Sequence, residues 1–270
     1  MKTVARTRVM GILNITPDSF SDGGRLLGRD AVAGHVRTMI EAGVDILDVG
    51  GESTRPFAEP VSPEEETARV IPVVELIREM SDLPVSIDTR KAAVAEAALA
   101  AGATMVNDIS ALRHDPAMLG VVRGYGGPVI IMHMQGTPET MQIQPHYDDV
   151  IGEITAFFRE RINWLEQNEI SRKRIVIDPG IGFGKTAEHN LTILRNIRAF
   201  KQLGCSVMIG HSRKSFIGGV LGLDVEHRDC ATAMLSLYCA LNEADLVRVH
   251  DVALSRQAVL LAQALKTAGS

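Results

Sequence analysis

The stretch Val9-Met10-Gly11-Ile12-Leu13-Asn14 shows the pattern that decides the fold: a short apolar run that stops on a polar residue. Seven more runs of this kind follow along the 270 residues, separated by stretches with helical periodicity. They lie at 44–48, 85–88, 105–108, 129–133, 175–178, 207–214 and 246–250. Strand, polar tip and helix, repeated eight times, predict an α/β fold, a closed (β/α)8 or TIM barrel with its reacting groups at one end.

The length suits one such barrel, so we expect residues 1–270 to form a single domain. The strands are continuous apolar runs, as expected when helices cover a parallel sheet. Helix starts are predicted at Ser62-Pro63, followed by Glu65, and at Asp30. Helix ends are predicted at Gly43, Gly102 and Gly204. The predicted helices are 30–42, 63–80, 90–101, 115–123, 148–168, 187–201, 229–243 and 251–267.

Two connections, which follow the first and second strands, are long. They run from Thr16 to Arg29 and from Gly51 to Ser62, whereas connections in α/β units usually have about 2–6 residues. Both follow carboxyl ends of strands, where barrel enzymes work. We therefore interpret them as functional loops. The alternative, surface segments without a role, does not explain Phe20 among polar neighbours.

Composition excludes several classes of protein. Apolar residues make up 46% of the chain, and the formal net charge of -5 argues against nucleic-acid binding. No apolar run reaches the roughly 18 residues of a membrane span, and no signal peptide is expected. Cys205, Cys230 and Cys239 are interpreted as reduced core thiols, which favours a cytoplasmic location.

A distinctive sequence accompanies each strand end. The segments are GILNITPDSFSDGG at 11–24, DVGGESTRP at 48–56, SIDT at 86–89, ND at 107–108, MHMQGTP at 132–138, DPGIGFGK at 178–185, SRKSF at 212–216 and RVHD at 248–251. In this order, over nearly the whole chain, they resemble dihydropteroate synthase, a folate-pathway transferase. The resemblance implies that 6-hydroxymethyl-7,8-dihydropterin pyrophosphate condenses with p-aminobenzoate to give 7,8-dihydropteroate and pyrophosphate.

The resemblance also implies which residues bind each substrate. It assigns pterin binding to Asp88, Asn107, Asp178 and Lys214, with Arg248 stacked on the face of the ring. The pyrophosphate falls to Asn14, Thr54, Arg55, Arg248 and His250, with Asn14 helping to hold Mg²⁺. The p-aminobenzoate falls to Phe20, Pro56, Lys214 and Ser215, while Asp22 helps to order the loops. These assignments fit elementary chemistry, because pterin edges need polar partners and departing pyrophosphate needs cations.

The substrate suggests a dissociative, SN1-like step in which a pterin cation is trapped by the aniline nitrogen. Asp88 and Asp178 would favour that cation, and Lys214 and Arg248 complete the predicted catalytic set. No nucleophilic triad is needed. Asp108 is interpreted as a loop or cap residue. Lys185 either contacts the barrel mouth or is solvated, and solvation is the commoner outcome for a lysine in a glycine-rich loop. Phe57 stands where the family commonly has glycine, and we hypothesise that it changes sulfonamide binding. The alternative, slightly favoured, is that Phe57 points to solvent or packs on the neighbouring helix.

Two other functions stay open: a catalytically inactive pterin-binding paralogue, and the pterin-binding domain of a methyltransferase with a similar barrel. The family resemblance further implies a homodimer, for which the helices at 229–243 and 251–267 are candidates. Packing of these helices against the barrel explains their pattern nearly as well. No zinc motif is present, and the segment ending at Lys185 lacks the first glycine of a phosphate-binding loop.

Overall fold

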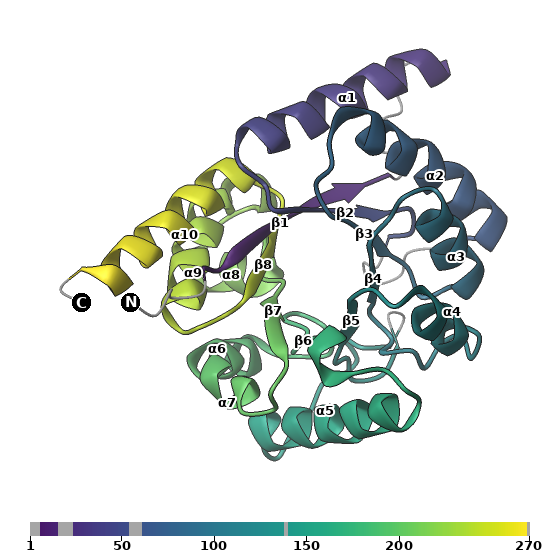
Figure 1. Ribbon diagram of the computed structural model, residues 1–270. Coiled ribbons are helices and arrows are strands. Elements are labelled where there is room, and N and C mark those ends of the chain that lie inside the picture. The colour runs from purple at the N-terminus through teal and green to yellow at the C-terminus, as the bar shows by residue number, and fades with distance from the viewer. Residues whose placement is uncertain (1–5, 16–23, 54–60, 138–139, 269–270) are drawn as a thin grey trace.

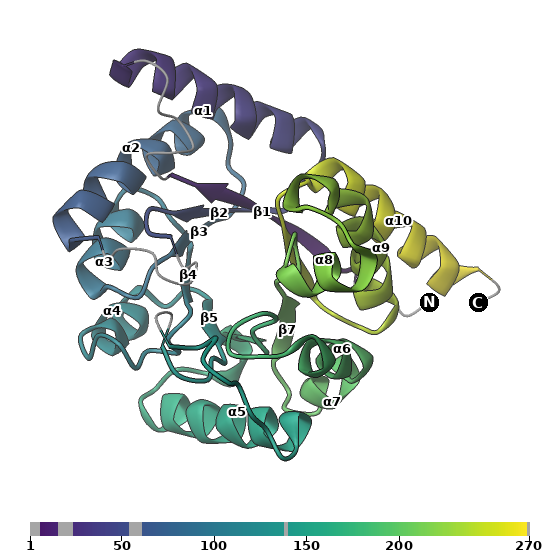
Figure 2. The ribbon, with the colours of Figure 1, turned by 180° about the vertical axis from the view of Figure 1, so that it is seen from behind.

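The computed structural model describes residues 6–15, 24–53, 61–137 and 140–268. Eight parallel strands close into a barrel in sequence order, and helices surround it, as Figures 1 and 2 show from opposite sides. The strands are β1 Arg8–Asn14, β2 Ile46–Gly50, β3 Val85–Asp88, β4 Met105–Asp108, β5 Val129–Met132, β6 Ile175–Asp178, β7 Ser206–Ile209 and β8 Leu246–Val249. The predicted fold class is therefore confirmed.

The helices follow the strands in the order predicted. They are α1 Gly24–Glu41, α2 Pro63–Met80, α3 Ala92–Ala100, α4 Met118–Tyr125, α5 Val150–Gln167, α6 Ala187–Arg195, α7 Ile197–Lys201, α8 Ser215–Leu221, α9 Asp229–Leu241 and α10 Val252–Thr267, with short 3-10 helices η2 Arg172–Arg174 and η3 Val225–His227. Within the described residues, no helix is long and apolar enough to cross a membrane.

Local signals placed most boundaries. Ser62 caps α2, because its Oγ accepts the Glu65 N–H at 3.2 Å and Pro63 occupies the first turn. The predicted helix at 187–201 is two helices, because Asn196 leaves the helical conformation between α6 and α7. The predicted start at Asp30 is wrong, because α1 already begins at Gly24. The low helix propensity of Gly28 is not enough to end a helix. The connection after β1 is correspondingly shorter.

Alternation along the strands separates two apolar cores. Side chains such as Leu47, Val49 and Ile87 face the helices, and the large outer core forms there. A smaller cluster fills the barrel interior, composed of Met10, Ile46, Met105, Ile130, Val176, Met208 and Leu246. This plug closes the amino-terminal part of the barrel and leaves the carboxyl ends for polar groups.

One prediction about the thiols is wrong. Cys205 and Cys239 are buried, but Cys230 is exposed on the first turn of α9. The helical pattern of that segment did not reveal which of its faces the barrel covers.

Candidate active site at the carboxyl ends of the strands

A polar layer lies directly above the apolar plug of the barrel. Side chains two positions apart on a strand share a face. The residue two positions after each plug residue therefore also faces the barrel interior, closer to the carboxyl end of the strand. Ile46 is followed by Asp48, Met105 by Asn107, Val176 by Asp178, and Leu246 by Arg248. The register pairs Asp88 on β3 with Asn107 on β4. Five of the eight strands therefore contribute a polar side chain at this end of the barrel.

Arg248 is the centre of this layer. Its Nε donates to Asp48 Oδ2 and its Nη2 to Asp88 Oδ2, each at 2.6 Å. The Asn107 amide Nδ2 lies 3.3 Å and 3.4 Å from the two Asp48 oxygens. Asp48 is completely buried, so this carboxylate depends on the guanidinium and the amide for its partners. The barrel thus unites residues up to 200 positions apart in the sequence.

The pKa values of the side chains in this layer depend on burial and on nearby charges. Burial, with smaller contributions from the Asp48 and Glu66 charges, raises the pKa of Asp88 to about 7, although Arg248 opposes the shift. Burial would lower the pKa of Arg248, but the Asp48 and Asp88 carboxylates outweigh it and raise that pKa above its ordinary value. Arg248 therefore remains a cation, and burial keeps the pKa of Asp88 above its ordinary value.

Asp178 and Lys214 occupy the other side of the layer. Asp178 Oδ1 accepts the Gly180 N–H at 2.8 Å. Burial raises the pKa of Asp178, and the Gly180 bond and Lys214 oppose this shift. Burial and the Arg248 charge lower the pKa of Lys214 to about 8, while Asp178 and Asp88 counteract them. The predicted pterin residues Asp88, Asn107, Asp178, Lys214 and Arg248 thus interact as one electrostatic unit.

Lys214 also has an aromatic neighbour. Its Nζ lies 4.1 Å from the centroid of the Phe183 ring, within the range of a cation–π interaction. Gly182, at a φ of 82°, lets the lysine side chain approach, because a Cβ there would meet Lys214 Cδ at 3.0 Å. Phe183 therefore borders the same end of the barrel as the polar layer.

Lys185 is buried, so its interpretation as a solvated lysine is wrong. Its Nζ donates to Phe183 O at 2.9 Å and to His133 O at 3.3 Å, and lies 3.1 Å from His133 Nδ1. Burial lowers the pKa of Lys185 to about 7, and burial with the Lys185 charge lowers that of His133 to about 3. The glycine-rich loop folds this lysine inward, which the sequence alone did not indicate.

His250 and Ser212 form a second polar pair. Ser212 Oγ accepts the His250 backbone N–H at 3.1 Å and lies 2.9 Å from His250 Nδ1. Burial lowers the pKa of His250 to about 3, so its imidazole is neutral. Ser212 therefore orients the imidazole ring of His250.

Two of the remaining predicted residues have exposed side chains. Asn14 ends β1 with an exposed side chain, and Ser215 is exposed at the start of α8. Asp108 is the last residue of β4, and its carboxylate caps the following turn, as the cap interpretation predicted, by accepting bonds from Ser110 and Leu112. Phe20, Asp22, Thr54, Arg55, Pro56 and Phe57 lie outside the described residues.

Two residues escaped the sequence reasoning. Asp48 ends one of the eight apolar runs, and that position was the available signal for its place beside Arg248. Phe183 lies in a glycine-rich loop, where nothing in the sequence indicated contact with Lys214. Among the described residues, no group of three or more His, Cys, Asp or Glu side chains could hold a metal ion.

A closed (β/α)8 barrel with ionisable groups at the carboxyl ends of its strands is the architecture of a barrel enzyme. The sequence matches the pterin-binding enzyme family over residues 10–250. It is 46% identical to a dihydropteroate synthase of Synechocystis sp. over 96% of this chain and 90% of that protein. It is 42% identical to the Escherichia coli dihydropteroate synthase over 98% and 94%.

Solved structures give the same relationship. The fold is similar to a Yersinia pestis dihydropteroate synthase with a sulfonamide drug, at a TM-score of 0.92 and 40% identity over 97% of this chain and 95% of that one. It is also similar to a Xanthomonas albilineans dihydropteroate synthase with 4-aminobenzoic acid, at a TM-score of 0.91 and 45% identity over 97% and 94%. The chain belongs to the dihydropteroate synthases within the pterin-binding enzyme family.

Proposed function

We propose that this protein is a dihydropteroate synthase. It joins 6-hydroxymethyl-7,8-dihydropterin pyrophosphate to p-aminobenzoate and releases pyrophosphate. The observation that carries the proposal is the convergence of Asp88, Asn107, Asp178, Lys214 and Arg248 at one end of the barrel. These groups offer the donors and acceptors that the edge of a pterin requires.

The polar layer suits a dissociative, SN1-like reaction. The bond between the exocyclic methylene and the pyrophosphate oxygen breaks, and its electron pair leaves with pyrophosphate. The aniline nitrogen then forms the new C–N bond and loses a proton. In this proposal the carboxylates of Asp88 and Asp178 stabilise the pterin cation, Asn107 and Lys214 hold the ring edge, and Arg248 lies against the ring face.

In this proposal the pyrophosphate is bound by Arg248, His250, Thr54, Arg55 and Asn14. Mg²⁺ fits the donor set: the exposed Asn14 amide has no partner among the described residues, and magnesium prefers few protein oxygens beside phosphate oxygens. When bound, the ion would neutralise charge on the leaving group. Asn14 would contribute one oxygen to it.

The p-aminobenzoate falls to the end of the layer that holds Lys214. Ser215 and the adjoining backbone would take its carboxylate, and the Phe183 ring beside Lys214 supports an aromatic neighbour there. Phe20 and Pro56 would close on its ring, and Asp22 would help to order the loops. The residues 16–23 and 54–60 lie outside the described structure, so the roles of Phe20, Pro56 and Asp22 rest on the resemblance.

Pyrophosphate release with both substrates and Mg²⁺ tests the proposal. Release that requires p-aminobenzoate is the expected result. Binding of the pterin without release would instead favour the inactive paralogue. Transfer of a methyl group from a methylated tetrahydrofolate would favour the methyltransferase. Asp178→Asn serves as the matched inactive variant, because it keeps the shape of the site and removes one carboxylate.

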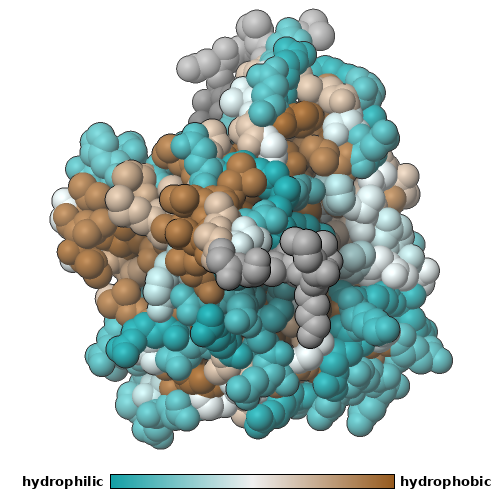
Figure 3. All heavy atoms as spheres, turned by 60° about the vertical axis from the view of Figure 1, so that its left-hand side comes forward, coloured by the Kyte–Doolittle hydropathy of each residue, from teal (hydrophilic) through white to brown (hydrophobic). Residues whose placement is uncertain are grey.

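A homodimer through α8, α9 and α10 forms part of the proposal. These helices expose Val220, Leu221, Met234, Tyr238, Leu260, Leu261 and Leu265, and hydrophobic surface gathers on their side of the molecule (Figure 3). A patch of this kind is typical of an interface between subunits. Met234→Asp, at a side chain that is 64% exposed, should halve the mass in sedimentation. Ile143→Asp, exposed on another face, is the control and should stay dimeric.

A cytoplasmic location completes the proposal. It rests on Cys205, Cys230 and Cys239, which are all free thiols. Such thiols persist where glutathione and thioredoxin keep them reduced.

A further inference from the structure

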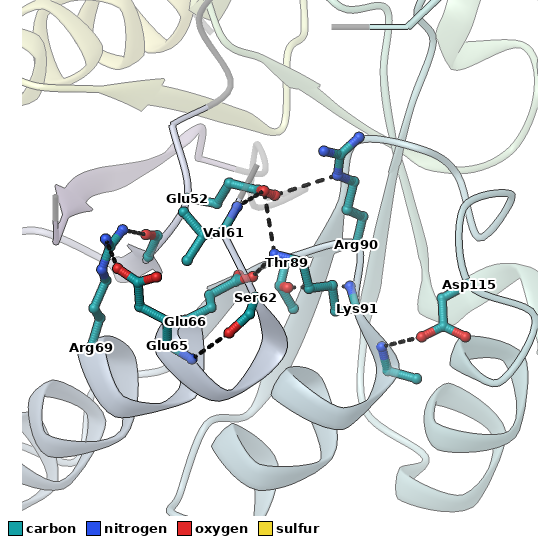
Figure 4. A network of polar contacts seen from close by, with 12 residues as sticks. Glu52, Val61, Ser62, Glu65, Glu66, Arg69, Thr89, Arg90, Lys91 and Asp115 are labelled. Atoms are coloured by element: carbon teal, nitrogen blue, oxygen red, sulfur yellow. Dashed lines mark hydrogen bonds and ion pairs between the residues drawn. The ribbon is translucent and has the colours of Figure 1, made fainter. Parts of the chain in front are cut away.

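A buried charge network lies behind the polar layer, at the point where β2 ends (Figure 4). Its central residue is Glu52, whose side chain is only 8% exposed. Glu52 Oε1 accepts the Val61 N–H at 3.0 Å and lies 3.3 Å from Lys91 Nζ, and Oε2 lies 3.4 Å from Arg90 Nε. One carboxylate therefore connects the chain after β2 with two other segments: Val61, which precedes the N-cap residue of α2, and the turn between β3 and α3.

Lys91 extends the network into α2. Its Nζ also pairs with Glu66 Oε2, and Glu66 is completely buried. The other oxygen, Glu66 Oε1, has no hydrogen-bond partner in the described structure. A buried carboxylate without a compensating cation is expensive, so Lys91 is needed where it lies. The ammonium group thus connects Glu52 with the inner face of α2.

The backbone after β2 is held from the opposite side as well. Arg69 Nη1 donates to Gly51 O at 2.8 Å. Gly51 lies so close to α2 that a Cβ would meet Val70 Cγ1 at 2.8 Å and Glu66 Cγ at 3.0 Å. The start of α2 and the end of β2 are consequently fixed against each other through both backbone and side chains.

The network continues directly from the site. Arg90 and Lys91 follow Asp88 by two and three residues, and Thr89 N–H donates to Asn107 O at 3.0 Å. Burial would raise the pKa of Glu52, but the Val61 bond and the Arg90 and Lys91 charges outweigh it and lower that pKa. Glu52 therefore stays ionised at neutral pH and keeps both cations in place.

We propose that Glu52 is a positioning residue for the pterin pyrophosphate site, an inference that rests on the proposed function. It holds the chain that follows Asp88 against the chain that follows Asp48. Through Arg90 and Lys91 it fixes the direction in which β3 leaves the barrel, and through Val61 it fixes the entry to α2. Among the described residues its carboxylate contacts Val61, Arg90 and Lys91. Loss of Glu52 would loosen Asp88 relative to Arg248 while both side chains remain.

Steady-state kinetics of Glu52→Ala and Glu52→Gln test this role. For Glu52→Ala we expect kcat/KM for the pterin pyrophosphate to fall about tenfold, mainly through KM, as for the loss of one charge-assisted hydrogen bond. Glu52→Gln should recover part of this loss, because its amide oxygen can still accept the Val61 N–H. Glu79→Gln is the matched control: Glu79 is an exposed glutamate at the other end of α2 that pairs with Arg29 and contacts none of the network residues named here, so its constants should match the native protein.

Thermal melting of each variant separates positioning from general stability. If both Glu52 variants melt earlier but keep the native KM and kcat, Glu52 has only a structural role and the proposal is wrong. If Glu52→Ala does not fold, the nearly isosteric Glu52→Gln still decides the question through its KM. A native protein that releases no pyrophosphate would contradict the proposed function instead, so the two failures are distinct.

Discussion

Asp48→Asn removes one of the two carboxylates that bind Arg248 and keeps the shape of the side chain. In the native protein Asp48 accepts Arg248 Nε at 2.6 Å and the Asn107 amide at 3.3 Å. The substituted amide has one oxygen for both donors, and its own NH2 group faces a cation or another amide. Arg248 then depends on Asp88 alone, and Asn107 loses the partner that orients it.

The size of the effect follows from these contacts. A hydrogen bond to a charged group contributes about 1.5–3 kcal/mol, so we expect a loss of about 2 kcal/mol in the free energy of unfolding. For a domain of this size that loss lowers the melting temperature by about 4–8 °C. An equal loss in the transition state lowers kcat/KM about 30-fold. Since Asp48 raises the pKa of Asp88, the acid side of the pH–rate profile should also move to lower pH.

Pyrophosphate release between pH 5 and 9, roughly the range in which Asp88 titrates, together with thermal melting, measures all three quantities. Asp45→Asn is the control. Asp45 precedes the same strand at the other end of the barrel and binds Arg6, Arg256 and the Val9 N–H. It should lose stability but keep kcat/KM and its pH profile. Native kinetics in Asp48→Asn would refute the reasoning, because the Arg248 contacts would then have no bearing on turnover.

Three further outcomes are expected. Asp88→Asn should keep the fold and lose most turnover. Folding raises the pKa of Asp88 from 3.8 to about 7, so the native protein should lose stability as the pH rises between these two values. Unfolding titrations of the variant should not show this loss. Lys185→Met should remove a gain in stability as pH rises from about 7 to 10.5, since the folded protein releases that proton early; identical slopes would exclude the buried ammonium. Phe57→Gly should change the inhibition constant of sulfamethoxazole, and equal constants would end that hypothesis.

The polar layer could be predicted in composition but not in its internal contacts. Period-two alternation places Asp48, Asp88, Asn107 and Arg248 on the inner face once the strands are known. Which donor binds which acceptor depends on the distances across the barrel. Asp48 therefore escaped the sequence reasoning although it ends an apolar run, because no local feature indicates a contact with a residue 200 positions away.

Lys185 and Glu52 are buried charged residues whose partners could not be predicted from the sequence. A lysine in a glycine-rich loop was expected to be solvated, and the sequence supports no expectation for Glu52. Both are buried, because Lys185 finds three acceptors on two loops and Glu52 finds donors from two segments. Burial of charge depends on partners supplied by distant parts of the chain.

The sequence by itself determined the barrel, the order of its strands and the end at which the functional groups gather. Those properties follow from local periodicity and from the short connections that join neighbouring strands. Only the tertiary structure decided the pairing of Arg248 with Asp48 and Asp88, the burial of Lys185 and the network around Glu52. The physical reason is that closing the barrel sets the distances among residues far apart in the sequence, and the free energy of a buried charge depends on those distances.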